Sequence, residues 1–500
     1  MNTRLSLYET FILLLIFSFI WFAPVTEFNV ISGDCISYLN SFKVSDNILK
    51  RLFTDLPSLS IFRPVADCFI YLCYRVFNTY YYGYYAVSII LHVSCSILIY
   101  RISNRLFNLD KVKSLLLTVL FITSMYSYYG IATITGIMEQ LCLLFSILFI
   151  ENLILYIQNK QQKHFILSIL YYLIIIFTHE RFIVLFSVLF VCVLCDSVSI
   201  KQKIYRLVIS LSPLLLFVFL KKIVFGGLIL KGTGQIPIAL DFSQVFTFIS
   251  RSLKSILGFN NGEPWLFSYF TYQNYNIYMK IASIISLFFI LIFILWKTVT
   301  LVKEFKSGFI SFHKDLSILL ILLTALMVSI LSYSVSTRIE MRQLYVPFTY
   351  FLLILSLIFA NYKNLITKFL SSFSFVFVFI LFFSQGVSFQ SYIKNLFFIH
   401  SSDYAKQVLD SVKIYDNTRL FIINHNELLF SISAYSNDNI FSIYYDKHPS
   451  VFIWNSRDEL EKLLSEKKFT NYDYILFPIS YDEIKICNFT NYRNCISNIK

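Results

Sequence analysis

The chain has 500 residues, of which 57% are hydrophobic and only 14% are charged. Soluble domains average about 25% charged residues, so this composition excludes an ordinary soluble globule. The formal net charge is +13, but the basic residues are spread through short loops. That distribution favours a membrane protein obeying the positive-inside rule over a nucleic-acid-binding protein.

Apolar runs recur along most of the chain. A helix that crosses about 30 Å of hydrocarbon needs roughly 20 mostly apolar residues. The first run lacks a small-residue cleavage site and is expected to be a retained helix. The window predicts eleven transmembrane helices, near residues 7–24, 83–101, 113–129, 137–157, 164–178, 182–198, 206–224, 277–302, 316–334, 344–361 and 367–387.

The loop charges indicate an orientation. If the N-terminus is cytoplasmic, every loop on that side is net basic, as the positive-inside rule requires. The first loop on the other side, 25–82, balances five acids with five bases, and a second long loop spans 225–276. An odd number of helices places the tail outside as well. The sequence therefore predicts a helical transmembrane region over 1–387 and an extracytoplasmic domain over 388–500.

The outward segments have secondary-structure patterns of their own. Ile36, Leu39 and Phe42 recur at helical spacing in the first loop, and the stretch 242–257 is also amphipathic. These patterns predict helices, those of the first loop lying at the membrane interface. In the tail, 418–424 and 472–478 are typical of short buried strands, and 403–414 and 457–468 of helices. Strands alternating with helices predict a small α/β domain.

Motifs for common cofactors are absent from the sequence. There is no nucleotide-binding loop, dinucleotide fingerprint or zinc-peptidase motif, and the nine cysteines lack metal-ligand spacing. The sequence therefore indicates no cofactor, and it leaves a divalent metal open, for which the polar turn at 178–181 is a candidate position. Cysteines of the first loop and of the tail could form disulfides if these segments are extracytoplasmic.

Asp34 is the leading candidate for a catalytic group. It follows the first apolar run, and Gly33 beside it permits a sharp turn of the backbone. A carboxylate in aromatic, partly dehydrated surroundings is suited to act as a general base. The alternative is that Asp34 caps the following amphipathic helix, an ordinary role for Asp.

Arg63 and His92 form a second group of candidates. Arg63 precedes Pro64, and a guanidinium matches the paired oxygens of a phosphate. Alternatively, Arg63 extends to lipid headgroups while Pro64 begins a helix. His92 lies inside an apolar run, where ionisable side chains are costly and often functional. A hydrogen-bonded packing histidine is the alternative for that residue.

A short polar turn, Thr178–Arg181, separates two apolar runs at the outer face. His179 and Glu180 in this turn are candidates for positioning an acceptor hydroxyl. Glu139, near the outer end of the fourth run, faces the same side. The alternative is that the turn is a solvated connection between two helices.

Arg338 and Arg342 lie in another short outward turn, just before Tyr345 and Pro347. Two arginines at a bilayer surface are well placed to hold a lipid phosphate. Being four residues apart, they would share one face of a helix. The alternative is that both bind phospholipid headgroups and have no further role.

These motifs follow the order found in one enzyme family. Over roughly residues 1–360 the chain resembles the type-C (GT-C) membrane glycosyltransferases, which include protein O-mannosyltransferases and bacterial enzymes that use polyprenyl-phosphate sugars. Its length, first loop and outward tail are also similar to those of the serotype-converting O-antigen glucosyltransferases. The motifs that carry the resemblance are Gly33-Asp34, Phe62-Arg63-Pro64, Leu91-His92, Glu180, and Arg342 with Tyr345 and Pro347.

The resemblance implies an inverting hexosyltransferase of the bacterial inner membrane, with a cytoplasmic N-terminus and a periplasmic tail. It implies a polyprenyl-phosphate sugar as the donor, for example of glucose, and a hydroxyl of a glycan such as lipopolysaccharide O-antigen as the acceptor. The resemblance and the residue patterns described above together give the candidate site residues: Asp34 and Glu180 for catalysis, Arg63, Arg338 and Arg342 for the donor phosphate, and Glu139, His179, His92 and Tyr345 around the acceptor. Of these, Arg338, Glu139 and His179 rest on the residue patterns alone.

The chain departs from the family at Cys35, which stands where relatives usually have a second acid. This leaves open whether one carboxylate suffices or whether Glu180 or Glu139 supplies another. A flippase of lipid-linked glycans and a glycan polymerase are the alternative functions. Transporters commonly have repeated halves and polar sites near the midplane, whereas no repeat is evident here and the charged candidates lie at the outer face.

Overall fold

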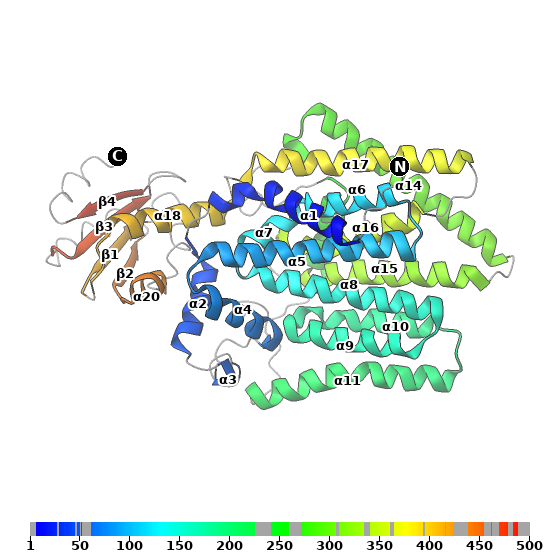
Figure 1. Cartoon of the computed structure of the whole chain (residues 1–500), viewed down its shortest axis with the longest axis horizontal. Helices are drawn as coiled ribbons and strands as arrows, with labels where there is room; N and C mark the ends of the chain where they lie inside the picture. Colours follow the sequence, from blue (N-terminus) through cyan, green and yellow to red (C-terminus); the bar gives the residue numbers. More distant parts are fainter. Residues whose placement is uncertain are drawn as a thin grey trace.

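The structure is a computed structural model that describes residues 7–27, 30–45, 48–50, 52, 62–225, 242–259, 272–306, 310–334, 341–360, 365–393, 396–415, 417–423, 439–454, 462, 470–478 and 484–488. Within these residues the chain forms a long helical bundle and a smaller region built on a four-stranded sheet (Figure 1). The bundle and the first loop carry all of the candidate site residues that are described.

The helices of the bundle lie roughly side by side along the long axis of the molecule (Figure 1). One continuous cluster of buried apolar side chains draws on nearly all of them. In chain order they are α1 (Leu7–Trp21), α5 (Tyr81–Arg101), α6 (Lys111–Ile122), α7 (Tyr128–Ala132), α8 (Gly136–Asn159), α9 (Gln162–Thr178), α10 (Phe186–Leu194), α11 (Ile200–Phe225), α12 (Phe242–Ile256), α14 (Ile277–Lys306), α15 (Ile310–Ser334), α16 (Tyr345–Ile358) and α17 (Leu365–Gln390).

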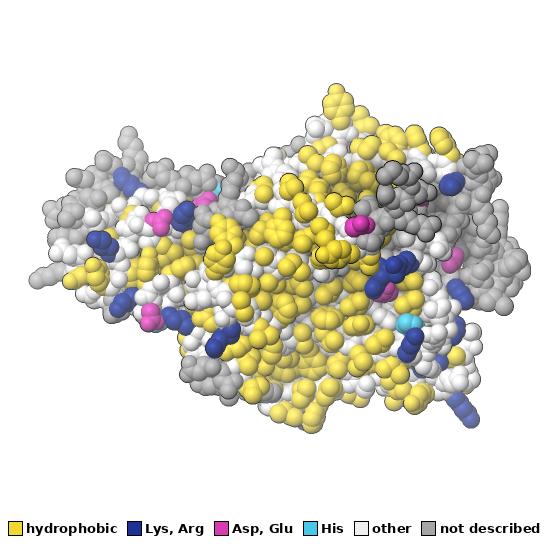
Figure 2. Space-filling view, viewed as in Figure 1, with side chains coloured by type: hydrophobic (Ala, Val, Ile, Leu, Met, Phe, Trp, Pro, Cys, Tyr) yellow, Lys and Arg dark blue, Asp and Glu magenta, His cyan; other side chains and the backbone are white. Residues whose placement is uncertain are grey.

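Several of these helices are of the membrane-spanning kind. Among the described residues, five are long and apolar enough to cross a bilayer, and a bent pair of helices makes a sixth. Hydrophobic side chains cover most of the bundle surface in Figure 2, while charged side chains lie mainly towards its ends and over the sheet region. The predicted class, a helical membrane protein, is therefore confirmed. The five are Tyr81–Leu106, Gly136–Asn159, Ile200–Val224, Lys314–Ser334 and Lys368–Gln390.

The run 113–129 is not one straight helix, as its hydropathy predicts, but two segments that meet at 48°. α6 ends at Ile122, and the hydroxyl of Ser124 accepts a hydrogen bond from the N–H of Tyr126 at 3.1 Å, which starts the next short helix. α17 lies directly against the break. A Cβ atom at Gly386 would come within 2.2 Å of the Thr123 carbonyl oxygen, so only glycine fits there.

The run 182–198 also differs from a full span. The chain forms the 3-10 helix η6 (Glu180–Leu185) and then α10, which has nine residues. A helix rises 1.5 Å per residue, so α10 alone cannot cross the hydrocarbon core.

The first loop contains the helices that its apolar spacing predicts. They are α2 (Asp34–Val44) and α4 (Pro64–Phe77), joined by a segment of which Ser45, a short helix, α3 (Ile48–Lys50), Leu52, Phe62 and Arg63 are described. The apolar stripe of α2, from Ile36 to Phe42, is buried against the rest of the protein. Both helices lie at the end of the bundle nearest the sheet (Figure 1).

The sheet has the strand order β2-β1-β3-β4. The predicted strands in 418–424 and 472–478 are confirmed as its two central members, and α18 (Phe397–Ser411) corresponds to the helix predicted over 403–414, although it begins earlier. The helix predicted over 457–468 lies outside the described residues, apart from Lys462. β1 (Arg419–Ile423) is parallel to both β2 (Ser450–Trp454) and β3 (Asp473–Pro478), whereas β4 (Ile484–Asn488) is antiparallel to β3.

The sheet region docks on the end of the bundle that carries α2 (Figure 1). The Tyr444 hydroxyl, on the helix α20 (Asn439–Tyr445), accepts a hydrogen bond from the N–H of Ile31 at 2.9 Å. The hydroxyl of Ser402 donates one to the carbonyl of Val30 at 2.7 Å. The first loop and the tail thus lie at the same end of the bundle, which is the arrangement that the loop charges predict.

Ion pairs tie helices together at the opposite end of the bundle. Lys160, after the end of α8, and Arg206, in α11, both pair with the buried carboxylate of Asp196. Arg101 at the end of α5 pairs with Glu151 in α8. Part of the positive charge of these loops is therefore neutralised within the fold.

The cysteines of the first loop do not form the disulfides considered above. Cys35, Cys68 and Cys73 are all free thiols. Cys487 in β4, by contrast, is disulfide-bonded. The tail therefore contains the oxidised cysteine that an extracytoplasmic location favours.

Candidate functional site

Charged side chains from several segments, distant in sequence, meet at the end of the bundle beside α2 and α4. We call this group the rim cluster. Four of its members are basic and two are acidic, which leaves an excess of two positive charges. The members are Arg63, Glu139, Glu180, Arg181, Lys221 and Arg342.

The centre of the rim cluster is the ion pair between Glu139 and Arg181. Glu139 lies in the first turn of α8, and Arg181, the last residue of the polar turn that the sequence singles out, lies at the start of η6. The guanidinium of Arg181 also lies over the ring of Tyr333, 4.3 Å from its centroid. Such a cation–π contact stabilises a desolvated arginine, so Arg181 is held on two sides.

Arg63 lies at the N-cap of α4, with Pro64 at the first helical position as predicted. Its side chain points into the protein and is only 9% exposed, so it does not extend to the lipid headgroups. Its Nη1 donates a weak hydrogen bond to the Met138 sulfur at 3.9 Å, and its Nε has no partner among the described residues. The charges of Glu180 and Arg181 act on it, and burial lowers the pKa of its guanidinium.

Arg342 reaches the rim cluster from η9 (Met341–Leu344). Its Nη1 donates a hydrogen bond to the Tyr129 hydroxyl at 2.6 Å, and its guanidinium lies 4.7 Å from the centre of that ring. The Tyr129 hydroxyl is in turn 3.0 Å from Oγ1 of Thr135. Arg338, expected to act with Arg342, lies outside the described residues.

The polar turn supplies two further predicted residues. Glu180 pairs with Lys221 near the end of α11, with 2.8 Å between Oε2 and Nζ. His179 is buried, and its Nδ1 is 3.5 Å from the N–H of Arg181. Burial, and then the positive charge of neighbouring Arg181 and Arg63, holds the pKa of His179 well below its ordinary range. His179 is thus neutral near pH 7 and is a poor general base.

Asp34 is the first residue of α2, and its side chain is exposed rather than dehydrated. It does not cap the helix: the capping position is Gly33, and no side-chain cap hydrogen bond is present. Gly33 has φ 61° and ψ −141°, a backbone conformation that favours glycine. The next residue, Cys35, places its sulfur 3.8 Å from Oγ1 of Thr135, which connects the start of α2 to Arg342 through Tyr129.

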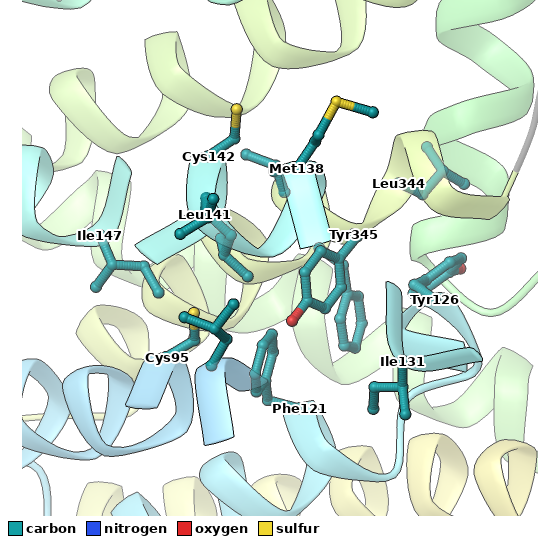
Figure 3. Close-up of a cluster of buried hydrophobic side chains, with 14 of the residues drawn as sticks. Cys95, Phe121, Tyr126, Ile131, Met138, Leu141, Cys142, Ile147, Leu344 and Tyr345 are labelled. Atoms are coloured by element: carbon teal, nitrogen blue, oxygen red, sulfur yellow. The ribbon is translucent and has the colours of Figure 1, made fainter. Parts of the chain in front are cut away.

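His92 and Tyr345 bind each other instead of the rim cluster. His92 Nδ1 is 2.7 Å from the Tyr345 hydroxyl, and the imidazole stacks on Phe121 with 4.6 Å between ring centroids. Figure 3 shows Tyr345 beside Phe121 within a cluster of buried apolar side chains from α5, α6, α8 and α16. This is the packing role that the sequence left open for His92.

Several contacts of the rim cluster carry no signal in the sequence. Tyr129 and Tyr333 are two among the 35 tyrosines, and nothing in their spacing marks them as partners of arginines. The pairing of Glu139 with Arg181 spans 42 residues. Among the residues that the structure describes, no three or more His, Cys, Asp or Glu side chains are grouped so that they could hold a metal ion.

Comparisons with known proteins add no relative to this picture. No protein-family model matches the chain, and no curated protein matches it significantly.

Proposed function

We propose that the protein is an inverting glycosyltransferase that moves a sugar from a polyprenyl-phosphate donor to a hydroxyl of an extracytoplasmic glycan. The sugar is a hexose such as glucose, and the acceptor is a glycan of the lipopolysaccharide O-antigen type. This proposal rests on the resemblance to the GT-C family, and the rim cluster supports it.

The observation that supports the proposal most directly is the state of Arg63. A buried cation costs several kcal/mol unless it is paired, yet Arg63 forms no ion pair with any described residue. An anionic ligand that pairs with the buried guanidinium of Arg63 would account for the retention of this costly charge. A phosphate with two or three oxygens suits a guanidinium, which donates paired hydrogen bonds.

In the proposed reaction, Arg63 and Arg342 hold the phosphate of the donor, with Arg338 as a further candidate. The acceptor oxygen attacks the anomeric carbon as the bond from that carbon to the phosphate oxygen breaks. Asp34 takes the proton of the hydroxyl, and polyprenyl phosphate leaves with the bonding electrons. The configuration inverts because the attack is direct. The arginines stabilise the charge that develops on the leaving phosphate, and Glu180 orients Lys221 beside it.

The contacts of the two remaining candidates, Glu139 and His179, indicate their roles. Glu139 holds Arg181 in place, so we propose that it is a positioning residue. His179 is neutral and buried between the arginines, where it can donate or accept a hydrogen bond to an acceptor hydroxyl. Neither residue is required to carry a proton in the proposed step.

We further propose eleven membrane crossings, in which η6 and α10 together form one, with a cytoplasmic N-terminus and a periplasmic tail in the bacterial inner membrane. The disulfide at Cys487 supports an oxidising location for the tail. The basic clusters around Lys160 and Arg206 support a cytoplasmic location for the opposite end. The bilayer, the lipid-linked donor and the glycan acceptor are then the partners of the protein.

The test is an assay with purified protein in vesicles that contain a radiolabelled polyprenyl-phosphate hexose, with lipopolysaccharide as the acceptor. Formation of a glycosidic product, with release of polyprenyl phosphate, supports transfer. Movement of the labelled lipid across the vesicle without product would instead identify a flippase, and joining of glycan repeats a polymerase. An Arg63→Gln variant should lose product formation if the anion argument is correct.

A further inference from the structure

The helix α20 of the sheet region holds α2 through a set of directional hydrogen bonds. Nδ2 of Asn40 donates to Oδ1 of Asn439 at 2.6 Å, and Oγ of Ser442 donates to Oδ1 of Asn40 at 2.9 Å. Lys43 adds two contacts, donating to the Ser442 carbonyl at 2.5 Å and pairing with Asp446 at 2.7 Å. The two helices are far apart in the sequence, since Asn40 and Asn439 are separated by 399 positions.

The other face of α2 makes a different kind of contact. Phe42 packs on Tyr71 and Tyr74 of α4, with ring centroids 5.5 and 6.0 Å apart. Apolar contacts tolerate sliding, because the hydrophobic effect is not directional, whereas hydrogen bonds require a defined geometry. The position of α2 along its own axis is therefore set mainly by Asn40 and its partners on α20.

The start of α2 is connected to the rim cluster through Thr135 and Tyr129. Asp34 opens the helix, and Cys35 contacts Thr135, which contacts Tyr129, the partner of Arg342. A shift of α2 along its axis would move Asp34 and Cys35 together relative to Thr135. The contacts that fix the position of α2 therefore also fix the position of Asp34 relative to the arginines.

We infer that Asn439 and Asn40 are positioning residues: the sheet region, through α20, sets the position of α2 and with it the position of Asp34 relative to the rim cluster. The part of this inference that concerns Asp34 rests on the proposed function, whereas the docking of α20 on α2 does not. Asn439 touches no group of the rim cluster itself and acts through α2.

Cys35 offers a native probe for this inference. Its thiol is buried against Thr135, and burial raises its pKa, so it reacts slowly with maleimides while α2 is docked. The experiment treats purified full-length protein with a maleimide and measures the labelling rate of Cys35 by peptide mass spectrometry. Peptide mapping separates this signal from the partly exposed thiols of Cys68 and Cys195.

Three variants are compared with the wild-type protein. Asn439→Leu removes the hydrogen bonds of Asn439 with Asn40 and with the Ser37 hydroxyl, and Cys35 should label about tenfold faster as α2 is loosened. Asn439→Asp keeps the oxygen that accepts from Asn40 and should retain slow labelling. Lys406→Ala changes an exposed residue of α18 and should leave the rate unchanged. Melting curves of both Asn439 variants show whether the sheet region remains folded.

The same variants separate this inference from the proposed function. In the transfer assay, Asn439→Leu should lower kcat while the KM for the donor stays within about twofold, because the arginines are untouched. Slow labelling of Cys35 in a folded Asn439→Leu variant would overturn the docking role. Fast labelling with normal kcat would overturn the positioning of Asp34. A wild-type protein without transfer activity would overturn the proposed function, and labelling would still decide the docking role.

Discussion

The guanidinium of Arg181 is held between the carboxylate of Glu139 and the ring of Tyr333. These two contacts of Arg181 join three segments, η6, α8 and α15. Because Arg181 is already neutralised by Glu139, Arg63, which forms no ion pair with a described residue, is the first arginine that we propose for an anionic ligand, and Arg342 is the second. The arrangement separates a structural arginine from two candidates for binding.

Glu139→Gln should destabilise the protein. It leaves Arg181 buried without a counter-charge, and breaking a buried pair in this way costs roughly 3–5 kcal/mol. The thermal unfolding midpoint in detergent measures the effect. The double variant Glu139→Gln with Arg181→Gln should recover most of the lost stability, since no unpaired charge remains. A double variant as unstable as the single one would show that the pair is not the cause.

Arg63→Gln should reduce sugar transfer without reducing stability. Loss of one donor to a developing oxyanion typically lowers the rate by roughly 10²–10³-fold. Removing a buried cation that has no ion pair among the described residues should leave the unfolding midpoint unchanged or raise it. Arg75→Gln is the matched control, because Arg75 is exposed at the other end of the same helix. A loss of stability in Arg63→Gln alone would assign Arg63 a structural role.

Asp34→Asn should abolish transfer while the amount of protein in the membrane stays unchanged. General-base catalysis contributes roughly 10²–10⁴-fold, and Asp34 neither caps α2 nor lies in the core, so its replacement should not affect folding. Asp410→Asn, which changes an exposed residue of α18, serves as the control. Retention of most activity would remove Asp34 as the base and direct attention to Glu180.

The free energy of unfolding should decrease as the pH rises towards 8, because of the buried carboxyl of Asp67. Burial raises the pKa of the Asp67 carboxyl in α4 from 3.8 to about 8. Between these values the folded protein holds a proton that the unfolded chain has lost, so raising the pH favours unfolding until the folded form also ionises. Unfolding midpoints at about pH 5, 7 and 9 test this expectation. Asp67→Asn should flatten the profile, and an unchanged slope would contradict the assignment.

The sequence predicts the elements of this fold better than their contacts. Long apolar runs identify helices such as α5 and α8, because nearly every side chain of such a helix faces the protein interior or the lipid and is therefore apolar. In the sheet, the strands that are predicted correctly are the central ones, β1 and β3. Central strands are buried on both faces and appear as continuous apolar runs, whereas the edge strand β4 (Ile484–Asn488) contains Lys485 and Asn488. The other edge strand, β2 (Ser450–Trp454), is as apolar as β1, so its composition does not distinguish it from the central strands.

The rim cluster is only partly predictable for the same reason. Arg63, Glu180 and Arg342 are conspicuous because charges are rare near apolar runs. Their partners are not, since Tyr129 is 213 residues from Arg342 and no local period relates the two. An apolar run also does not reveal where a helix breaks, so the sequence predicts neither the bend after Ile122 nor the short α10.

The close approach of Gly386 to Thr123 has a consequence for how the protein is made. Backbone groups at a break in a membrane helix are tolerated only where other protein covers them, and α17 provides that cover. α17 is synthesised last among the helices of the bundle, long after α6 and α7 have left the ribosome. The backbone groups at the break must therefore be covered in another way until α17 is inserted. α17 is thus the helix that completes the biogenesis of the bundle.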